Sequence, residues 1–273
     1  MDRSNSFLTN KPDSITTEEV MADFLDAISK IYSNSMLLKG CMALYIHSDL
    51  KTNLRKTRDL DFNFFYLEDW EDFCENSFLI ATKFSKLKFT YAITKRRGFD
   101  KNPSGDSLKF KASKDGQVIE FKIDMNIGGN ELSELNSELT RSPINLYSVY
   151  GILSDKLKVL SERKLCRRIK DLIDVYYIST TMCIDFKVLV DAILFKYKEE
   201  ILGNLNPCFV LDLENYDQIK YAYDKYDIGD IKKEDFEVVY AVVVYFVSPV
   251  YEFLLDRELC YSSWSKEELL WLR

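Results

Sequence analysis

Histidine is almost absent from this chain of 273 residues, in which His47 is the only one. Zinc centres and His-based catalytic triads need histidine as a ligand or a base, so we expect neither. The six cysteines are scattered and form no C-x-x-C pair. This spacing argues against a disulfide framework and favours reduced thiols.

Long apolar segments are also missing. The opening residues, MDRSNSFLTNKPDS, are polar and lack the apolar core of a signal peptide. The longest uncharged run, Val238–Tyr251, is shorter than the ~20 residues needed to cross a bilayer, and it contains Pro249. We therefore expect a buried helix in this run, no membrane association and a cytoplasmic protein.

The overall composition is that of a folded protein. Hydrophobic residues make up 47% and aromatic residues 14%, enough to fill real cores, so disorder is a poor interpretation. The net charge of −7 argues against a general nucleic-acid coat protein, although a global sum hides local basic patches. The length suits one large domain or two modest ones.

Residues 1–145 alternate between helical and strand patterns. Thr16 and Glu19 form a capping-box pattern at the start of a first helix, and Asp115-Gly116 is a hairpin turn signal between two strands. Strands are predicted at residues 36–40, 59–65, 86–97 and on both sides of the turn, with a short helix from Cys41. We expect a mixed α/β domain over residues 1–145, with at least four strands.

The pattern changes to helices after residue 145. Three segments with helical periodicity cover residues 147–164, 166–182 and 185–202, and another apolar helix is predicted at 237–255. We therefore predict an α/β (α+β) fold with a mixed sheet over residues 1–145, followed by an all-helical domain over residues 146–273.

Acidic side chains recur on two of the predicted strands. Because successive strand residues point to opposite faces, Asp59 and Asp61 share one face, and Glu120, Lys122 and Asp124 share another. If the strands are neighbours, Asp124 or Glu120 joins the aspartate pair as a third carboxylate, depending on register. Such a cluster would hold one or two Mg²⁺ ions, which prefer carboxylate oxygens and suit phosphate chemistry.

Gly40 stands between the predicted strand at residues 36–40 and the helix that follows. The backbone N–H groups at the start of a helix favour a phosphate group, and glycine permits close approach. A solvated strand face remains the alternative for the Asp-x-Asp pair alone. The order strand, glycine, helix, Asp-x-Asp strand and third-carboxylate strand is more specific.

The sequence resembles the AbiEii/AbiGii family of toxin nucleotidyltransferases. The likeness rests on LLKGCMALYI, RKTRDLDFNF, FKIDMNIG and SVYGILSDKLKVLSERKLCRRIKDLIDVYYI, over about residues 35–180. The matching positions are Gly40, Ala43-Leu44, Arg55-x-Thr57-x-Asp59-Leu60-Asp61-Phe62, Lys156 and Arg168-x-Lys170-Asp171-x-x-Asp174.

The resemblance implies a nucleotidyltransferase fold and a set of roles. Asp59, Asp61 and Asp124 would be catalytic carboxylates on Mg²⁺, and Lys156 would contact nucleotide phosphates. Asp171 would belong to the active site, orienting Lys156 or activating the acceptor hydroxyl. The residues implied to bind the nucleotide are Gly40, Cys41, Arg58, Lys156 and Arg168.

The resemblance also implies a reaction and partners. A nucleoside monophosphate would pass from an NTP to a hydroxyl acceptor, with an RNA such as a tRNA 3′ end favoured over a protein. The protein would be the toxin of a toxin–antitoxin or phage-defence pair, whose antitoxin need not touch it. Cys41 departs from the Gly-Gly or Gly-Ser motif of the family, which bears on how phosphate is bound.

Several alternatives stay open. A catalytically inactive module that binds a nucleotide or RNA is the main one, and a metal-dependent phosphodiesterase or nuclease would share the carboxylates. Asp171 and Asp174 would equally serve as structural partners of nearby basic residues. The basic residues between Lys156 and Lys170 would line a triphosphate or form a solvated face. The clusters Lys51/Arg55/Lys56/Arg58 and Lys95-Arg96-Arg97 would hold RNA or serve solubility.

Overall fold

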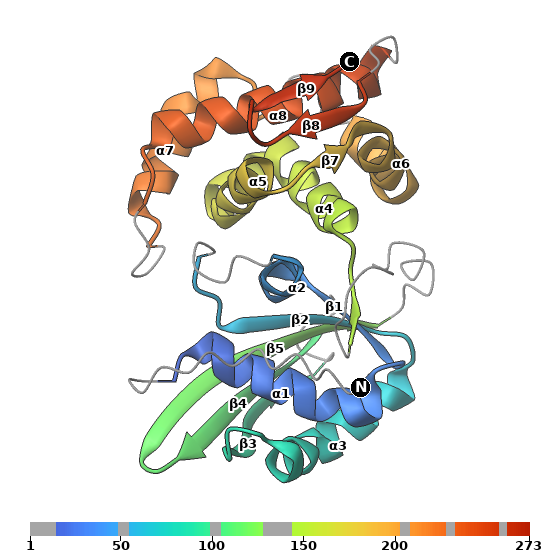
Figure 1. The fold of residues 1–273 in the computed structure, drawn as a ribbon, viewed down its shortest axis with the longest axis vertical. Helices are drawn as coiled ribbons and strands as arrows, with labels where there is room; N and C mark the ends of the chain where they lie inside the picture. The colour runs from blue at the N-terminus through green and yellow to red at the C-terminus, as the bar shows by residue number, and fades with distance from the viewer. Residues whose placement is uncertain are drawn as a thin grey trace. The chain divides into compact units, whose positions relative to one another are not determined.

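The computed structural model describes residues 15–48, 55–98, 105–127, 144–202, 208–227, 233–256 and 261–273. The chain divides into two compact units. The first unit consists of Met1–Asp49 and Lys56–Tyr147, and the second of Leu50–Arg55 and Ser148–Arg273. Figure 1 gives the labels used below.

A mixed sheet of six strands forms the centre of the first unit. Its spatial order is β3-β4-β5-β2-β1-β6, in which β2 pairs in parallel with β5, and β1 in parallel with β6. The other pairs are antiparallel. The strands are β1 (Met36–Lys39), β2 (Asp59–Phe64), β3 (Thr90–Arg97), β4 (Asp106–Lys114), β5 (Gln117–Ile127) and β6 (Asn145–Leu146).

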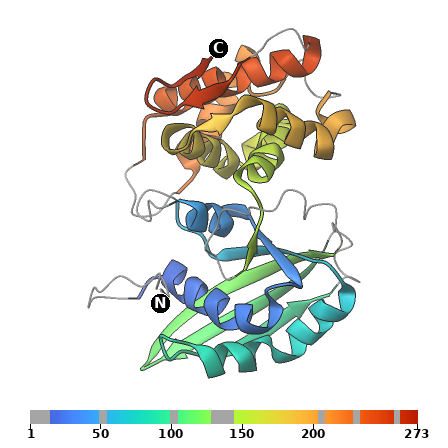
Figure 2. The same ribbon diagram turned by 45° about the vertical axis from the view of Figure 1, so that its right-hand side comes forward.

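One face of this sheet is apolar and packs on two helices, α1 (Thr17–Tyr32) and α3 (Leu67–Phe84). Phe24 of α1 contacts Phe110 and Phe121 at centroid distances of 4.9 and 5.2 Å. Phe73 of α3 lies 5.2 Å from Phe64 of β2. Figures 1 and 2 show both helices on the same side of the sheet. The hydrophobic effect of burying these aromatic rings fixes which face of each strand is turned inward.

The opposite face of the sheet is polar, because alternate residues of the same strands point away from the core. Near β1 and β2 this face is met by α2 (Gly40–His47), which packs against both strands. His47 at the end of α2 places its Nε2 2.8 Å from the carbonyl oxygen of Tyr147, and burial lowers the pKa of its imidazole.

Two local signals behave as the sequence predicts. The side chain of Thr16 accepts a hydrogen bond from the N–H of Glu19, whose carboxylate accepts one from the N–H of Thr16. Asp115 and Gly116 both have positive φ, 49° and 82°, the conformation of a tight hairpin turn between β4 and β5.

The second unit is mostly helical. Its packing centres on α4, whose Leu153 and Leu157 are fully buried, and on α8, whose Phe246 and Val247 are fully buried. Its described residues form the α-helices α4 (Val149–Ser161), α5 (Lys170–Thr181), α6 (Phe186–Leu202), α7 (Tyr216–Lys225) and α8 (Phe236–Asp256).

By length and composition α8 is the one helix in the described part of the chain that would be able to cross a membrane. Half of its most apolar window is buried within the protein, as expected for the core helix predicted from Val238–Tyr251. Its Tyr251 donates a hydrogen bond of 2.6 Å to the carbonyl oxygen of Leu157.

The fold adds three features to the sequence prediction. A small sheet of β7 (Ile184–Asp185), β8 (Ser263–Ser265) and β9 (Leu270–Leu272) accompanies the helices of the second unit. The basic stretch after α4 forms a separate 3₁₀ helix, Arg163–Arg167. Helix α3 was not predicted, although its buried Trp70, Phe73, Ser77 and Ala81 have helical spacing. Most of the predicted loop at residues 98–106 lies outside the described residues.

Phe24 should carry much of the stability of the first unit. Replacing Phe24 by Ala removes ring contacts with both α3 and the sheet, and we expect a loss of about 3–5 kcal/mol in free energy of unfolding. Urea denaturation followed by circular dichroism measures it. Ile31→Ala on the same helix, where the side chain is 56% exposed, is the matched control and should change little. Equal effects of the two changes would contradict this core.

Candidate active site

The predicted carboxylates lie on neighbouring strands. In the parallel pair β2–β5, Asp61 is directly opposite Asp124, and Asp59 is opposite Lys122. Residues that face each other across paired strands point to the same side of the sheet, so Asp59, Asp61 and Asp124 share the polar face. Strands in a sheet are about 4.8 Å apart, which puts Asp61 and Asp124 within reach of one ligand.

The register also separates the two candidates for a third carboxylate. Asp124 is level with Asp61, whereas Glu120 pairs with Lys111 of β4 and lies before the first residue of β2. Asp124, and not Glu120, therefore adjoins the aspartate pair.

Gly40 sits directly against Asp61. The backbone of Gly40 has φ +68°, which residues with a Cβ rarely adopt, and a Cβ built there would lie 2.2 Å from Asp61 Oδ2. The residue just before it, Lys39, pairs with Asp61 across the β1–β2 ladder. A glycine is thus required both by the turn from β1 into α2 and by the aspartate beneath it.

The start of α2 lies close to the carboxylates for the same reason. No side chain caps the N-terminal turn of this helix, which begins with Gly40 and Cys41. Cys41 is buried, and Arg58, just before β2, is exposed. Uncapped N–H groups at a helix start attract anions.

A lysine currently neutralises part of the acidic cluster. Lys122 Nζ lies 2.5 Å from Asp124 Oδ1 and donates a hydrogen bond of 2.7 Å to Oδ2. Within the described ranges, no three His, Cys, Asp or Glu side chains are grouped closely enough to ligate one metal ion. The type of ligand and the strand register fit a hard divalent cation, provided that Lys122 moves aside.

The predicted residues of the second unit form a buried ionic network. Lys156 of α4 donates hydrogen bonds of 3.0 Å to Asp171 and 2.6 Å to Asp174, both on α5. Asp174 also accepts two hydrogen bonds from Arg55, at 2.8 and 3.0 Å. We call Arg55, Lys156, Asp171 and Asp174 the buried network. Its four side chains are all at least 90% buried.

The charges of the buried network stabilise one another. Burial alone would lower the pKa of Lys156, but Asp174 and Asp171 outweigh it and raise the pKa above its usual value. Burial alone would raise the pKa of Asp174, yet Lys156 and Arg55 lower it to about 2. Since both shifts favour the charged form, Lys156 and Asp174 stay ionised at neutral pH.

This network changes how the predicted role of Lys156 is understood. Its ammonium group already contacts two carboxylates and its side chain is only 6% exposed, so at most one of its three N–H groups is left for a phosphate. Arg168 is more accessible, with 41% of its side chain exposed. Its Nε lies 2.7 Å from Asp171 Oδ2, so the two side chains form an ion pair, but the geometry is not that of a hydrogen bond. The basic residues between Lys156 and Lys170 do not form one continuous surface, because Lys156 is buried while Arg163, Lys164 and Arg167 are exposed.

Sequence reasoning missed the partner of Asp174. Arg55 was considered for RNA binding, whereas the structure pairs it with Asp174. One feature of the sequence pointed to this pair: Arg55 and Asp174 both belong to motifs on which the family resemblance rests. Asn63 was also missed: it follows Asp59 and Asp61 on the same face of β2, and its buried side-chain oxygen has no hydrogen-bond partner among the residues that the structure describes.

Comparisons with known proteins identify the family and similar folds. The family model for the nucleotidyl transferase AbiEii toxin of type IV toxin–antitoxin systems matches residues 23–237. A Helicobacter pylori protein whose crystal structure is described as that of a nucleotidyltransferase has a TM-score of 0.50 and 13% identity, covering 92% of this chain and all of that one. JHP933 from Helicobacter pylori has the same score and identity, covering 91% and 96%. No curated protein matches the sequence.

Replacing Gly40 by Ala should do more damage than the same change elsewhere. Gly116→Ala is the matched control, because Gly116 also has a positive φ but a Cβ added there would have no atom within 4 Å. We expect the control to lose about 1 kcal/mol from backbone strain and Gly40→Ala to lose clearly more, since Asp61 must also move. Chemical denaturation of both variants tests this. Indistinguishable losses would show that the contact with Asp61 is unimportant.

Asp174→Asn should destabilise the second unit by about 3–5 kcal/mol at neutral pH, because it removes the buried carboxylate charge that pairs with both Arg55 and Lys156. The pKa of Asp174 is near 3.8 in the unfolded chain and about 2 in the folded protein. Its carboxylate therefore stabilises the folded state fully above pH 3.8, and this contribution is lost as the pH falls through about 2. The gap between wild type and variant should therefore shrink by about 2–3 kcal/mol on acidification.

Urea unfolding of both proteins at several pH values between 6 and 2 measures this gap. Asp191→Asn removes an exposed carboxylate from the i,i+4 pair with Lys187, and it should leave stability nearly unchanged at every pH. A gap between wild type and Asp174→Asn that did not depend on pH would contradict the lowered pKa.

Proposed function

Because this chain belongs to the AbiEii family of nucleotidyltransferase toxins, we propose that it transfers a nucleoside monophosphate from an NTP to a hydroxyl acceptor. The proposed acceptor is RNA, in particular the 3′ end of a tRNA. The family is that of type IV toxin–antitoxin systems, so an antitoxin partner is implied. We propose a cytoplasmic toxin that acts in phage defence, and an antitoxin that need not contact it.

The observation that best supports this chemistry is the position of Asp61. Asp61 lies opposite Asp124 on the neighbouring strand and directly beneath Gly40, at the uncapped start of α2. Carboxylates for a cation and N–H groups for a phosphate therefore occur side by side in the first unit. A phosphoryl transfer site needs both.

In the proposed reaction, the acceptor oxygen forms a bond to the α-phosphorus of the NTP. The bond from that phosphorus to the oxygen bridging to the β-phosphate breaks, and pyrophosphate leaves with the electron pair. The hydroxyl proton passes to one of the carboxylates Asp59, Asp61 or Asp124. One or two Mg²⁺ ions held by these carboxylates would neutralise phosphate charge. Gly40 and Cys41 would bind phosphate oxygens through their N–H groups, and Arg58 would add a positive charge.

The second unit would contribute through the buried network. We propose that Asp171 and Asp174 fix the position of Lys156, and that Lys156 and Asp171 in turn orient Arg168. Arg168 contacts this network through Asp171, has 41% of its side chain exposed and would bind the nucleotide. Lys156 would contact phosphate through the one N–H group that its two carboxylate partners leave.

A catalytically inactive module that binds a nucleotide or RNA is the second candidate. It is favoured by the ion pair between Lys122 and Asp124, in which an ammonium group stands in for a bound cation. The same fold and the same basic residues would then serve binding alone.

The test is to incubate the protein with each α-³²P-labelled NTP, Mg²⁺ and total tRNA, and to follow the label into RNA on a denaturing gel. We expect label transfer that stops when EDTA removes the metal. Asp61→Asn and Asp124→Asn should each lower the rate by at least about 100-fold, because each removes a carboxylate charge at the proposed site.

Glu120→Gln is the matched control, because it removes an acidic charge from the same face of β5 away from Asp61, and it should retain activity. Shortened RNA would instead identify a nuclease. Binding of NTP or RNA without any transfer would favour the inactive module. Label transfer that survives Asp61→Asn and Asp124→Asn would refute the proposed site.

A further inference from the structure

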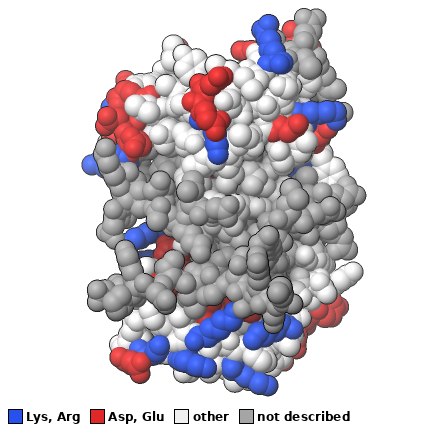
Figure 3. Space-filling model, viewed as in Figure 1, with Lys and Arg blue, Asp and Glu red and all other residues white. Residues whose placement is uncertain are grey.

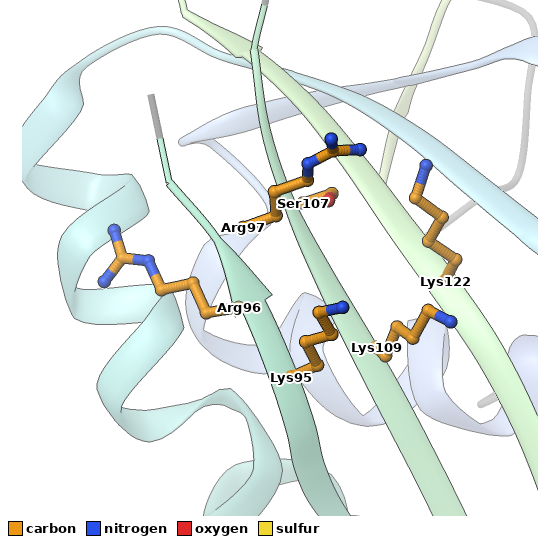
Figure 4. Close-up of a pocket in the computed structure, with 6 residues that line it drawn as sticks. All are labelled: Lys95, Arg96, Arg97, Ser107, Lys109 and Lys122. Atoms are coloured by element: carbon orange, nitrogen blue, oxygen red, sulfur yellow. The ribbon is translucent and has the colours of Figure 1, made fainter. Parts of the chain in front are cut away.

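A row of positive side chains crosses three strands of the first unit on the polar face of its sheet. Lys122 of β5 is paired with Lys109 of β4, and Lys109 with Lys95 of β3. Arg97 lies two residues beyond Lys95 on β3. We call Lys95, Arg97, Lys109 and Lys122 the cationic row. Figure 4 shows these side chains around a pocket of about 620 Å³, which Ser107 also lines.

Among the described residues, most of the charge of the cationic row has no ion-pair partner. Lys95, Arg97 and Lys109 form no ion pair with any residue in the described part of the chain. Arg96 differs from its neighbours, because its side chain pairs with buried Asp106 at 3.1 Å. Like charges that face each other on paired strands destabilise a sheet. An anion bound over the row would remove that repulsion.

The cationic row runs from the proposed active site to the edge of the sheet. At one end Lys122 contacts Asp124, which is level with Asp61 of the proposed active site. At the other end the row reaches β3, the edge strand of the sheet. Three adjacent strands give the row a width of about 10 Å. A site that starts at the carboxylates and continues to an open edge suits a chain of phosphates better than one compact small molecule.

We propose that the cationic row binds the phosphate backbone of a single-stranded RNA segment and leads its hydroxyl end toward Asp61 and Asp124. The orientation of the RNA rests on the proposed function, whereas the binding itself does not. The row consists of lysine and arginine side chains, which contact phosphates and read no base sequence by their charge. Binding is therefore weakly dependent on sequence and strongly dependent on salt.

The test measures the binding of a fluorescein-labelled, unstructured 12-nucleotide RNA by anisotropy, without NTP or divalent metal, between 0.05 and 0.3 M salt. For single strands, each lost phosphate contact lowers the slope of log K against log salt by about 0.7, which is about fivefold in affinity at 0.1 M salt. Lys95→Gln/Lys109→Gln should therefore bind about 25-fold more weakly and show a slope smaller by about 1.4.

Lys83→Gln/Lys88→Gln is the matched control, because it makes the same change in net charge at two exposed lysines outside the cationic row. It should bind RNA like the wild type. Equal weakening by both pairs of changes would overturn the proposal, since it would reduce the effect to net charge. Displacement of the RNA by equimolar inorganic tripolyphosphate would also overturn it, in favour of a compact triphosphate site.

The outcomes for the cationic row and for the proposed function can be told apart. If Lys95→Gln/Lys109→Gln loses RNA binding while the wild type transfers no label, the RNA-binding role of the cationic row is supported and the proposed nucleotidyl transfer is refuted. If the wild type transfers label and Lys95→Gln/Lys109→Gln binds RNA and transfers label equally well, the RNA-binding role of the cationic row is refuted and the proposed nucleotidyl transfer is supported. Circular dichroism shows whether the variants are folded.

Discussion

The parallel pairing of β2 with β5 is the interaction on which the rest of the first unit depends. It places Asp61 opposite Asp124, and a shift of either strand by one residue would turn the carboxylate of that strand toward the aromatic core. That shift is prevented by the other face of the same strands, where Phe62, Phe64 and Phe121 pack beneath α1 and α3. The packing of these aromatic side chains therefore fixes the strand register that brings the carboxylates of Asp61 and Asp124 together.

Charge is handled in opposite ways in the two units. In the second unit Arg55, Lys156, Asp171 and Asp174 compensate one another away from water, which ties α4, α5 and the chain at Arg55 together. In the first unit Lys95, Arg97 and Lys109 lie on an open face and form no ion pair with another described residue. Figure 3 shows both signs exposed on the described surface. Buried pairs hold a structure in place, while exposed unpaired charges are available to ligands.

The sequence predicted the elements around the candidate site because each has a strong local signal. Strand alternation placed Asp59, Asp61 and Asp124, and the Asp115-Gly116 turn fixed the β4–β5 hairpin. The choice between Asp124 and Glu120 depended on the strand pairing, which is a long-range property. The partners of Lys156 and Asp174 were equally beyond local reasoning, because Arg55 lies more than a hundred residues from Asp174. Helix α3 had a usable apolar spacing that went unnoticed.

The edge strand β3 has a further consequence for the behaviour of the protein in solution. An unpaired strand edge can recruit another chain into a continuous sheet, and charged residues are a common protection against it. In β3 the exposed run Lys95-Arg96-Arg97 makes a second copy an electrostatically poor partner, and the opposite edge, β6, is only two residues long. Removing these charges would expose the protein to aggregation through its own backbone, even with its native fold intact.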